Sequence, residues 1–182
     1  PEIEQITLQP GVAPSATPKN DPHEIAFTPD KTEYLVTCQR TNEVRFFDAA
    51  ADSLIAIVPT GVYPQEIAFS STTDYVFISC MEDNLTFAGN VGSVSVINYR
   101  THTLVKSINT GFQPHGLSVD DESMQVFVAN RNANPNGPAP HHTTGCGGRN
   151  GYLTIIDMNT LELVSGFRAE LSVDPYFVAV RR

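Results

Sequence analysis

Apolar residues along this chain occur in short runs separated by polar turns, and the runs return in the same order. The clearest recurring run starts at a proline: Pro-His-Glu-Ile-Ala-Phe (22–27), Pro-Gln-Glu-Ile-Ala-Phe (64–69), Pro-His-Gly-Leu-Ser-Val (114–119) and Pro-Tyr-Phe-Val-Ala-Val (175–180). Apolar positions within the runs alternate or are continuous, as in β-strands, and no apolar stripe has the roughly 3.6-residue period of a helix. The pattern predicts an all-β protein built on an internal repeat.

Each of the first three copies is followed by three further predicted strands. The second strand of each repeat falls at 34–38, 75–80 and 126–130, the third at 43–48, 92–98 and 151–157, and the fourth at 53–58, 103–108 and 161–165. Four antiparallel strands in a unit of roughly 40 to 45 residues, or longer with an insertion, are typical of a β-propeller blade. A two-sheet sandwich could hold as many strands, but it would not explain why the same motif restarts.

The repeat starts divide the chain into blades. We expect the end of a preceding blade and a connecting loop at 1–21, blades at 22–63, 64–113 and 114–171, and the first strand of a further, closing blade at 172–182. Propellers close a ring of roughly four to eight blades, so about three and a half blades leave the ring open. We therefore expect additional blades before Pro1, in the same chain or another one, with about seven in the complete ring.

Several phrases resemble a known family of repeats. They are Pro-His-Glu-Ile-Ala-Phe with its downstream Thr-Pro-Asp, then Tyr-Val-Phe-Ile-Ser, Ser-Val-Ser-Val-Ile-Asn and Tyr-Leu-Thr-Ile-Ile-Asp-Met-Asn-Thr-Leu-Glu. From about Pro22 to Arg182 the units resemble the YVTN-type, surface-layer and lactonase-like β-propeller repeats of secreted and cell-surface bacterial and archaeal proteins. The resemblance implies a periplasmic, cell-surface or extracellular location in a bacterium. It is specific for fold rather than activity, because such propellers include binding modules, lactone hydrolases and haem-d1 carriers.

Charge and hydropathy argue against two classes of partner. The chain has 20 acidic and 11 basic residues and a net charge of −9, whereas nucleic-acid phosphates require clustered lysine and arginine. No apolar run approaches the roughly 18 residues that a membrane-spanning helix needs. We expect neither a nucleic-acid partner nor a membrane span.

The repeat also predicts which residues share a face. Successive strands of a blade are antiparallel, so the loop leading into the first strand and the loop between the second and third strands lie at the same end. The residue after each repeat proline begins the innermost strand and should face one mouth of the central channel; these residues are His23, Gln65, His115 and Tyr176. Glu24 and Glu66 recur beside them, and their repetition predicts a role in building the blades by bonding neighbouring backbone amides.

Both long insertions of the chain fall at this same end. One covers about 81–91, and the other covers 131–150, with Arg131 and Arg149 near its limits. Long loops held on one side of a rigid scaffold are where a propeller places a binding surface. We expect this face to engage a protein, glycan or small ligand.

The insertion at 131–150 contains the strongest candidate metal ligands. His141, His142 and Cys146 offer two imidazoles and a thiol, which suit a zinc-like or copper-like transition metal, although their spacing matches no standard zinc finger. Its many Pro, Gly and Asn residues equally describe an irregular loop without a metal. Cys38 and Cys80 occupy equivalent positions on adjacent blades, where Cα atoms lie farther apart than the ~7 Å limit of a disulfide, so we expect no bond between them.

Two functional interpretations follow. No Gly-x-Ser-x-Gly elbow, His-Glu-x-x-His helix, phosphate loop or Cys-x-x-Cys-His haem site is present, which favours a non-catalytic binding or scaffold module of the cell envelope or exterior. The alternative is a metal- or haem-dependent enzyme or redox subunit, or a lactonase-like hydrolase, with its site on the same face. His23 and His115 fit either interpretation, because an imidazole at the channel mouth can contact a ligand or bond backbone groups and order water.

Overall fold

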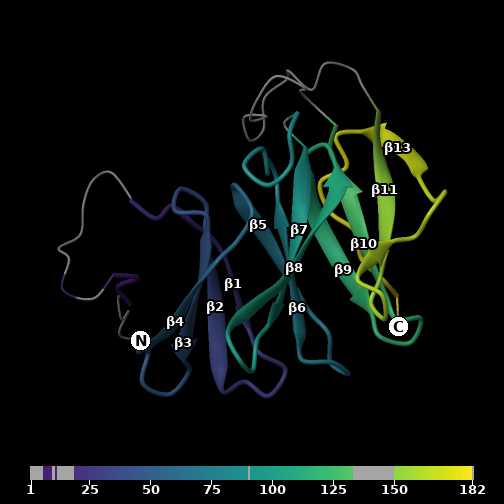
Figure 1. Cartoon of the computed structure of the whole chain (residues 1–182). Helices are drawn as coiled ribbons and strands as arrows, with labels where there is room; N and C mark the ends of the chain where they lie inside the picture. The colour runs from purple at the N-terminus through teal and green to yellow at the C-terminus, as the bar shows by residue number, and fades with distance from the viewer. Residues whose placement is uncertain (1–5, 10, 12–18, 90, 133–149, 182) are drawn as a thin grey trace.

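The computed structural model describes residues 6–9, 11, 19–89, 91–132 and 150–181 of the chain. Across these residues it contains thirteen β-strands and no helix (Figure 1), which confirms the predicted all-β class. This part of the chain accordingly offers no helix long and apolar enough to cross a membrane.

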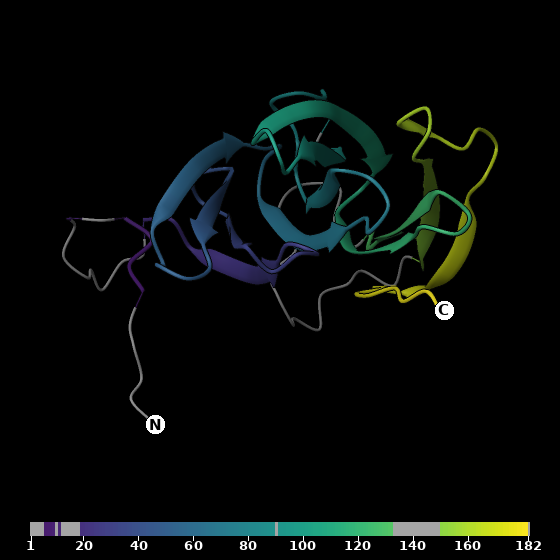
Figure 2. The same cartoon turned by 90° about the horizontal axis from the view of Figure 1, so that it is seen from below.

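The strands form three antiparallel sheets that follow one another along the chain. The first contains β1 (Pro22–Phe27), β2 (Glu33–Cys38), β3 (Glu43–Asp48) and β4 (Leu54–Pro59). The second contains β5 (Pro64–Phe69), β6 (Tyr75–Cys80), β7 (Gly92–Asn98) and β8 (Thr103–Gly111). The third contains β9 (Pro114–Asp120), β10 (Gln125–Asn130), β11 (Asn150–Asp157) and β12 (Glu162–Leu163), with β13 (Ala169–Val173) also paired to β11. Seen from below, the three sheets lie side by side in chain order (Figure 2).

The apolar core lies between neighbouring sheets. Leu35 and Phe46 of the first sheet belong to one buried cluster with Ile78 of the second, whereas Phe77 belongs to the next cluster, with Val128 of the third sheet. Successive residues of a strand point to opposite faces, so β6 uses Ile78 for one interface and Phe77 for the other. This double burial explains why the second and third strands of each repeat are continuous apolar runs.

The outer edge of the third sheet differs from the prediction. Instead of one strand at 161–165, β12 pairs with the end of β11 and β13 pairs with its beginning. Between them the Val164 amide donates to the Ile155 carbonyl of β11 at 2.8 Å, and Gly166 takes a positive φ of 75°. An outer strand has one neighbour instead of two, so its pairing is less strongly constrained by the sheet.

The two ends of the described chain lie against the first and third sheets. Leu8 packs on the first sheet, and its carbonyl accepts a hydrogen bond from the Arg45 guanidinium, although residues 6–9 form no strand. Residues 175–180, expected as an inner strand, follow β9, where the Gly116 amide donates to the Tyr176 carbonyl at 3.0 Å, and they are not assigned to a sheet. The outward face of β1 leaves Ile25 58% and Phe27 56% exposed.

Candidate functional site

Each inner strand begins with the same irregularity, in which two of its residues lie opposite a single residue of the second strand. The pairs are His23 and Glu24 opposite Thr37, Gln65 and Glu66 opposite Ser79, and His115 and Gly116 opposite Ala129. This two-to-one pairing is a β-bulge, which bends the strand and re-aims its side chains. The bulge therefore sets the direction of the residues that the sequence assigned to the channel mouth.

A bulge removes a backbone amide from the sheet ladder, and that amide needs another acceptor. In the first sheet the Thr37 hydroxyl accepts from the Glu24 amide at 2.9 Å and donates to the Gln65 carbonyl of the next sheet at 2.9 Å. Ser79 does the same for the bulge amide of its own sheet at 3.1 Å and for the His115 carbonyl at 2.5 Å. These hydroxyls tie the starts of the three inner strands to one another.

In the third sheet the bulge amide finds its acceptor without a hydroxyl side chain. Its equivalent residue is Ala129, and the Gly116 amide donates instead to the Tyr176 carbonyl at 3.0 Å. A Cβ atom on Gly116 would lie 2.5 Å from Phe177 Cα and 2.6 Å from the Tyr176 oxygen. Glycine is therefore required here for the close approach of 175–178.

The residue before each repeat proline takes a left-handed conformation. The φ angles are 53° for Asp21, 62° for Tyr63, 56° for Gln113 and 56° for Asp174. This region costs a non-glycine residue roughly 1 kcal/mol or more. The carbonyls of the first three accept hydrogen bonds from the amides that directly follow the second strands, at 2.9–3.0 Å. The turn thus joins the start of each inner strand to the end where the long insertions leave the sheets.

Glu24 has the building role that its repetition predicted. Its carboxylate accepts a hydrogen bond from the Ile67 amide of the neighbouring sheet. Burial and the nearby negative charge of Glu66 raise the pKa of Glu24 to about 7. The hydrogen bond from the Ile67 amide acts in the opposite direction but is the smaller effect. A carboxyl group poised near neutral pH is common at functional sites as well as in buried structural networks.

Glu66 occupies the equivalent position but is used differently. Among the described residues no backbone amide donates to its carboxylate, and one of its oxygens lies 3.7 Å from Nδ1 of His115. Burial raises the pKa of Glu66. The carboxylate also lies near His23, and donor atoms of His23, Glu66 and His115 are all within 4.8 Å of one another. Three sheets therefore contribute one donor each to a single cluster.

Tyr176 and Arg131 form one wall of this cluster. The Tyr176 ring lies against the fully buried His115 ring, with centroids 3.8 Å apart, and the Arg131 guanidinium lies 5.5 Å from the Tyr176 centroid. Arg131 is buried and pairs with Asp174, with Nη2 and Oδ2 3.0 Å apart. The sequence placed His23, His115, Tyr176 and Arg131 on one face, and the structure brings them together.

Gln65, the remaining predicted channel residue, is fully buried. Its amide nitrogen donates to the carbonyls of Tyr63 at 3.1 Å and Pro64 at 3.2 Å, which fixes the orientation of the amide. Its side-chain oxygen accepts no hydrogen bond from the described part of the chain. A buried amide oxygen of this kind is a ready acceptor for a bound water or ligand.

The two insertions leave the sheets beside the cluster. Asp83 organises the first of them, accepting from the Ser93 hydroxyl at 2.6 Å and from the Thr86 amide at 3.1 Å, and this turn presents Leu85 at 81% exposure. The ends of the second are held together where the Asn132 side chain donates to the Asn150 carbonyl at 2.8 Å.

Arg149 and the predicted metal ligands His141, His142 and Cys146 lie outside the described residues. Cys38 and Cys80 are buried free thiols. Burial raises the pKa of each to about 11, so both behave as small apolar side chains.

Comparison with known proteins identifies the fold. No family model matches the chain, and no curated protein matches it in sequence. Among solved structures, Kuenenia stuttgartiensis hydrazine synthase superposes with a TM-score of 0.70 and 19% identity over 94% of this chain and 42% of that one. The U3-55K structure superposes with a TM-score of 0.60 and 8% identity over 88% of this chain and 44% of that one. The chain is a β-propeller-like protein. It spans less than half the length of either structure, and at these identities the likeness shows the fold alone.

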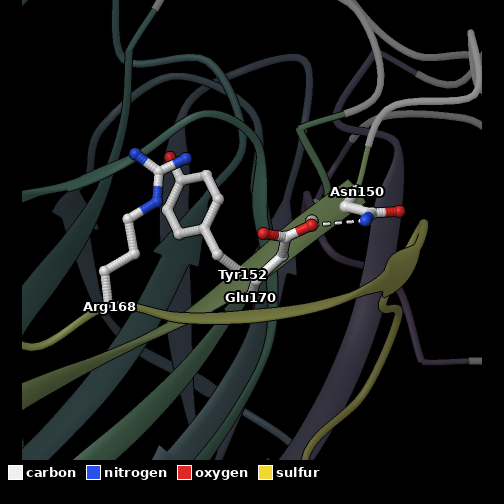
Figure 3. Close-up of a pocket in the computed structure, with 5 residues that line it drawn as sticks. Asn150, Tyr152, Arg168 and Glu170 are labelled. Carbon is white, nitrogen blue, oxygen red and sulfur yellow. Dashed lines mark hydrogen bonds between the residues drawn. The ribbon is translucent and has the colours of Figure 1, made fainter.

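A cleft lies at the split edge of the third sheet. Asn150, Gly151, Tyr152, Arg168 and Glu170 line a cleft of about 470 Å³ between β11 and β13. Arg168 stands against the Tyr152 ring, 3.6 Å from its centroid, and Glu170 reaches Asn150 (Figure 3). The repeat register gave no sign of this cleft, because it depends on the division of the outer strand. The sequence does mark the position of Glu66, because a glutamate recurs there in two copies of the repeat and glycine replaces it in the third.

Proposed function

We propose that this chain is a YVTN-type β-propeller binding and scaffold module of the bacterial cell envelope or exterior. It engages a protein, glycan or small ligand through the face where the inner strands begin, together with the insertions at 81–91 and 131–150. The observation that supports this proposal is the convergence of His23, Glu66, His115 and Tyr176 on one place. Neither the fold nor the likeness to other propellers assigns a ligand.

The way this face is built favours a ligand-binding role for its side chains over a purely structural one. Hydroxyl bridges fix the starts of the inner strands, so a ligand would meet side chains whose positions are already set, and binding would require little ordering. The insertions add adaptable surface around this fixed centre, as Leu85 illustrates. A rigid centre surrounded by loops is the usual arrangement of binding sites on β-scaffolds.

We also propose that further blades, about seven in total, complete the ring. Ile25 and Phe27 on the outward face of β1, and Phe177 at 63% exposure, are apolar surfaces that another blade would cover. The test is the intact mass of the native protein and of whatever co-purifies with it. A mass equal to these 182 residues, with no second polypeptide, would contradict ring completion.

The binding proposal is tested with the full natural polypeptide bearing Leu85→Asp, which changes the exposed tip of the first insertion. We expect partners recovered from the envelope fraction of the source cells to be lost from this variant. Glu122→Lys, in an exposed turn between β9 and β10 at the opposite ends of the strands, should retain them. Cell fractionation and immunoblotting test the location. Equal recovery by both variants, or a protein found in the cytoplasm, would contradict the proposal.

A metal-dependent or redox subunit is the second candidate, favoured by two imidazoles and a carboxylate within one cluster. A haem or copper centre in the native protein would give a visible absorbance band. A lactonase-like activity would release acid from a simple lactone, which a pH-stat measures. A colourless protein that hydrolyses no lactone argues against this candidate and leaves the binding proposal standing.

A further inference from the structure

The donor cluster at the start of the inner strands differs from the metal ligands that the sequence suggested. It contains no cysteine and lies on the sheets themselves rather than in an insertion. His23 comes from β1, Glu66 from β5 and His115 from β9. Each residue is separated from the next by a whole repeat, which explains why no local spacing motif reveals the group.

The distances suit convergence on one ion. The donor atoms lie within 4.8 Å of one another, and the Glu66 oxygen is 3.7 Å from His115 Nδ1. Bonds of about 2.0–2.2 Å from nitrogen and carboxylate oxygen to a first-row ion would place donors roughly 3–3.5 Å apart. Small rotations of the half-buried His23 and Glu66 side chains would bring the donor atoms to this separation, while the fully buried His115 stays in place.

The strands hold the donors in position independently of any ion. Ser79 bonds both the Glu66 amide and the His115 carbonyl, so it fixes two donor residues through one hydroxyl. Tyr176 packs on the His115 ring. A specific metal site requires ligand residues that surrounding contacts already hold in position.

The contrast with Glu24 indicates that the Glu66 carboxylate is not needed to build the sheets. Glu24 bonds an amide of the neighbouring sheet, whereas the equivalent carboxylate of Glu66 faces imidazole instead. A buried Gln65 side-chain oxygen, at the repeat position between those of His23 and His115, accepts nothing from the described residues. This oxygen is therefore available as an acceptor for a water molecule or a ligand on the same face.

We propose that His23, Glu66 and His115 bind one divalent first-row transition-metal ion. Two neutral imidazoles and one carboxylate suit Zn²⁺, Fe²⁺ or Cu²⁺ rather than Ca²⁺ or Mg²⁺, which take predominantly oxygen ligands. Three protein ligands leave positions open for water or an exogenous ligand. The net charge of −9 favours approach of a cation. This proposal names a ligand for the proposed binding face and rests on that proposed function.

The test uses the full natural polypeptide, freed of metal with a chelator and titrated with Zn²⁺ and Co²⁺. We expect one ion per chain by calorimetry, and a Co²⁺ absorption spectrum that reports nitrogen and oxygen ligands. Glu66→Gln and His23→Ala should each weaken binding at least about 10-fold, since the first replaces an anionic oxygen ligand with a neutral amide and the second removes an imidazole ligand. Near-ultraviolet circular dichroism checks that the variants remain folded.

Two controls make the result specific. His102→Ala removes a histidine that also faces a carboxylate, Glu33 at 2.9 Å, but lies outside the cluster, so it should leave affinity unchanged. His141→Ala with His142→Ala tests the insertion and should also leave affinity unchanged. Absence of stoichiometric binding, or loss of binding on changing the insertion but not Glu66, would overturn the metal proposal. Partner recovery through the surface at Leu85 is measured separately, so failure of the metal site does not decide the proposed function.

Discussion

The junction between the first and second sheets and the junction between the second and third start from the same bulge and use it differently. At the first junction, the Thr37 hydroxyl accepts a hydrogen bond from the bulge amide of Glu24, and the Glu24 carboxylate accepts one from the Ile67 amide. At the second, Ser79 repeats the hydroxyl bridge, but Glu66 faces His115. The same carboxylate position therefore bonds a backbone amide of the neighbouring sheet in one repeat and faces an imidazole in the next.

The contact between the third sheet and residues 175–180 is a further variation on this bulge. Gly116 and Ala129 replace the carboxylate and hydroxyl residues, and backbone contact with Tyr176 takes their place. Side-chain bridges tolerate modest changes in spacing, whereas backbone contact at this separation tolerates none. The three cases differ in how much a single substitution should cost.

The largest effect is expected at the glycine. Gly116→Val would bring side-chain atoms against the backbone of Tyr176 and Phe177, and we expect a loss of about 3 kcal/mol in the free energy of unfolding. Urea unfolding gives the loss, and hydrogen exchange should be faster at residues 116 and 180, whose amides donate to the Tyr176 carbonyl and the Ser118 hydroxyl. Ser165→Val, at an exposed position, should change neither quantity. Unchanged exchange at 116 and 180 would show that the close contact is not required.

The hydroxyl bridge should rank second. Ser79→Ala leaves the Glu66 amide and the His115 carbonyl without their partner, and a buried group deprived of its hydrogen bond costs about 1–3 kcal/mol, so we expect about 2 kcal/mol. Ser165→Ala is the matched control. If both alanine variants unfold at the same urea concentration, the bridge does not join the sheets as described.

The two carboxylates provide the sharpest test of the comparison. Glu24→Ala removes the acceptor of the Ile67 amide and should cost about 1–2 kcal/mol. Glu66→Ala removes no described backbone hydrogen bond and should stay within about 0.5 kcal/mol of wild type in metal-free protein. Chemical denaturation of both variants in parallel measures the difference. Equal losses would mean that both carboxylates build the sheets.

The smallest effect concerns pH. Burial raises the pKa of Glu24 from 4.5 to about 7. Between about pH 4.5 and pH 7 the folded state therefore keeps a proton on this carboxyl that the unfolded state has released. Stability from this group is complete below about pH 4.5 and is lost as pH rises through about 7. Because Glu24 is partly exposed, we expect no more than about 1 kcal/mol between pH 5 and pH 8. Thermal unfolding should show a lower Tm at pH 8, and Glu24→Ala should reduce the shift; a higher wild-type Tm at pH 8 would contradict it.

Much of the fold could be read from the sequence because the repeat fixes it at many positions at once. The prolines at 22, 64 and 114 begin β1, β5 and β9, as the motif predicted. The middle strands are buried on both faces and therefore have long apolar runs. The split of the outer strand into β12 and β13 was missed because an edge strand has only one neighbour, and its sequence carries less information about pairing.

The site was predictable in location but not in composition. The antiparallel alternation of strands was enough to place His23, His115 and Tyr176 at one end. It could not show which of two identical glutamates would bond an amide and which would face imidazole, because that depends on distances between sheets. The role of Glu66 becomes visible only when its contacts are compared with those of Glu24.

The left-handed residue before each repeat proline has a consequence for protein engineering. It fixes the backbone at the start of each repeat, while the side chain that follows the proline is histidine, glutamine, histidine and tyrosine in the four copies. His23 could therefore be exchanged for glutamine to remove an imidazole, whereas Gln65→His would also remove the hydrogen bonds that the Gln65 amide donates to Tyr63 and Pro64. The equivalent position in each repeat is therefore presented by the same backbone turn, and a substitution there changes the donor group that this face offers.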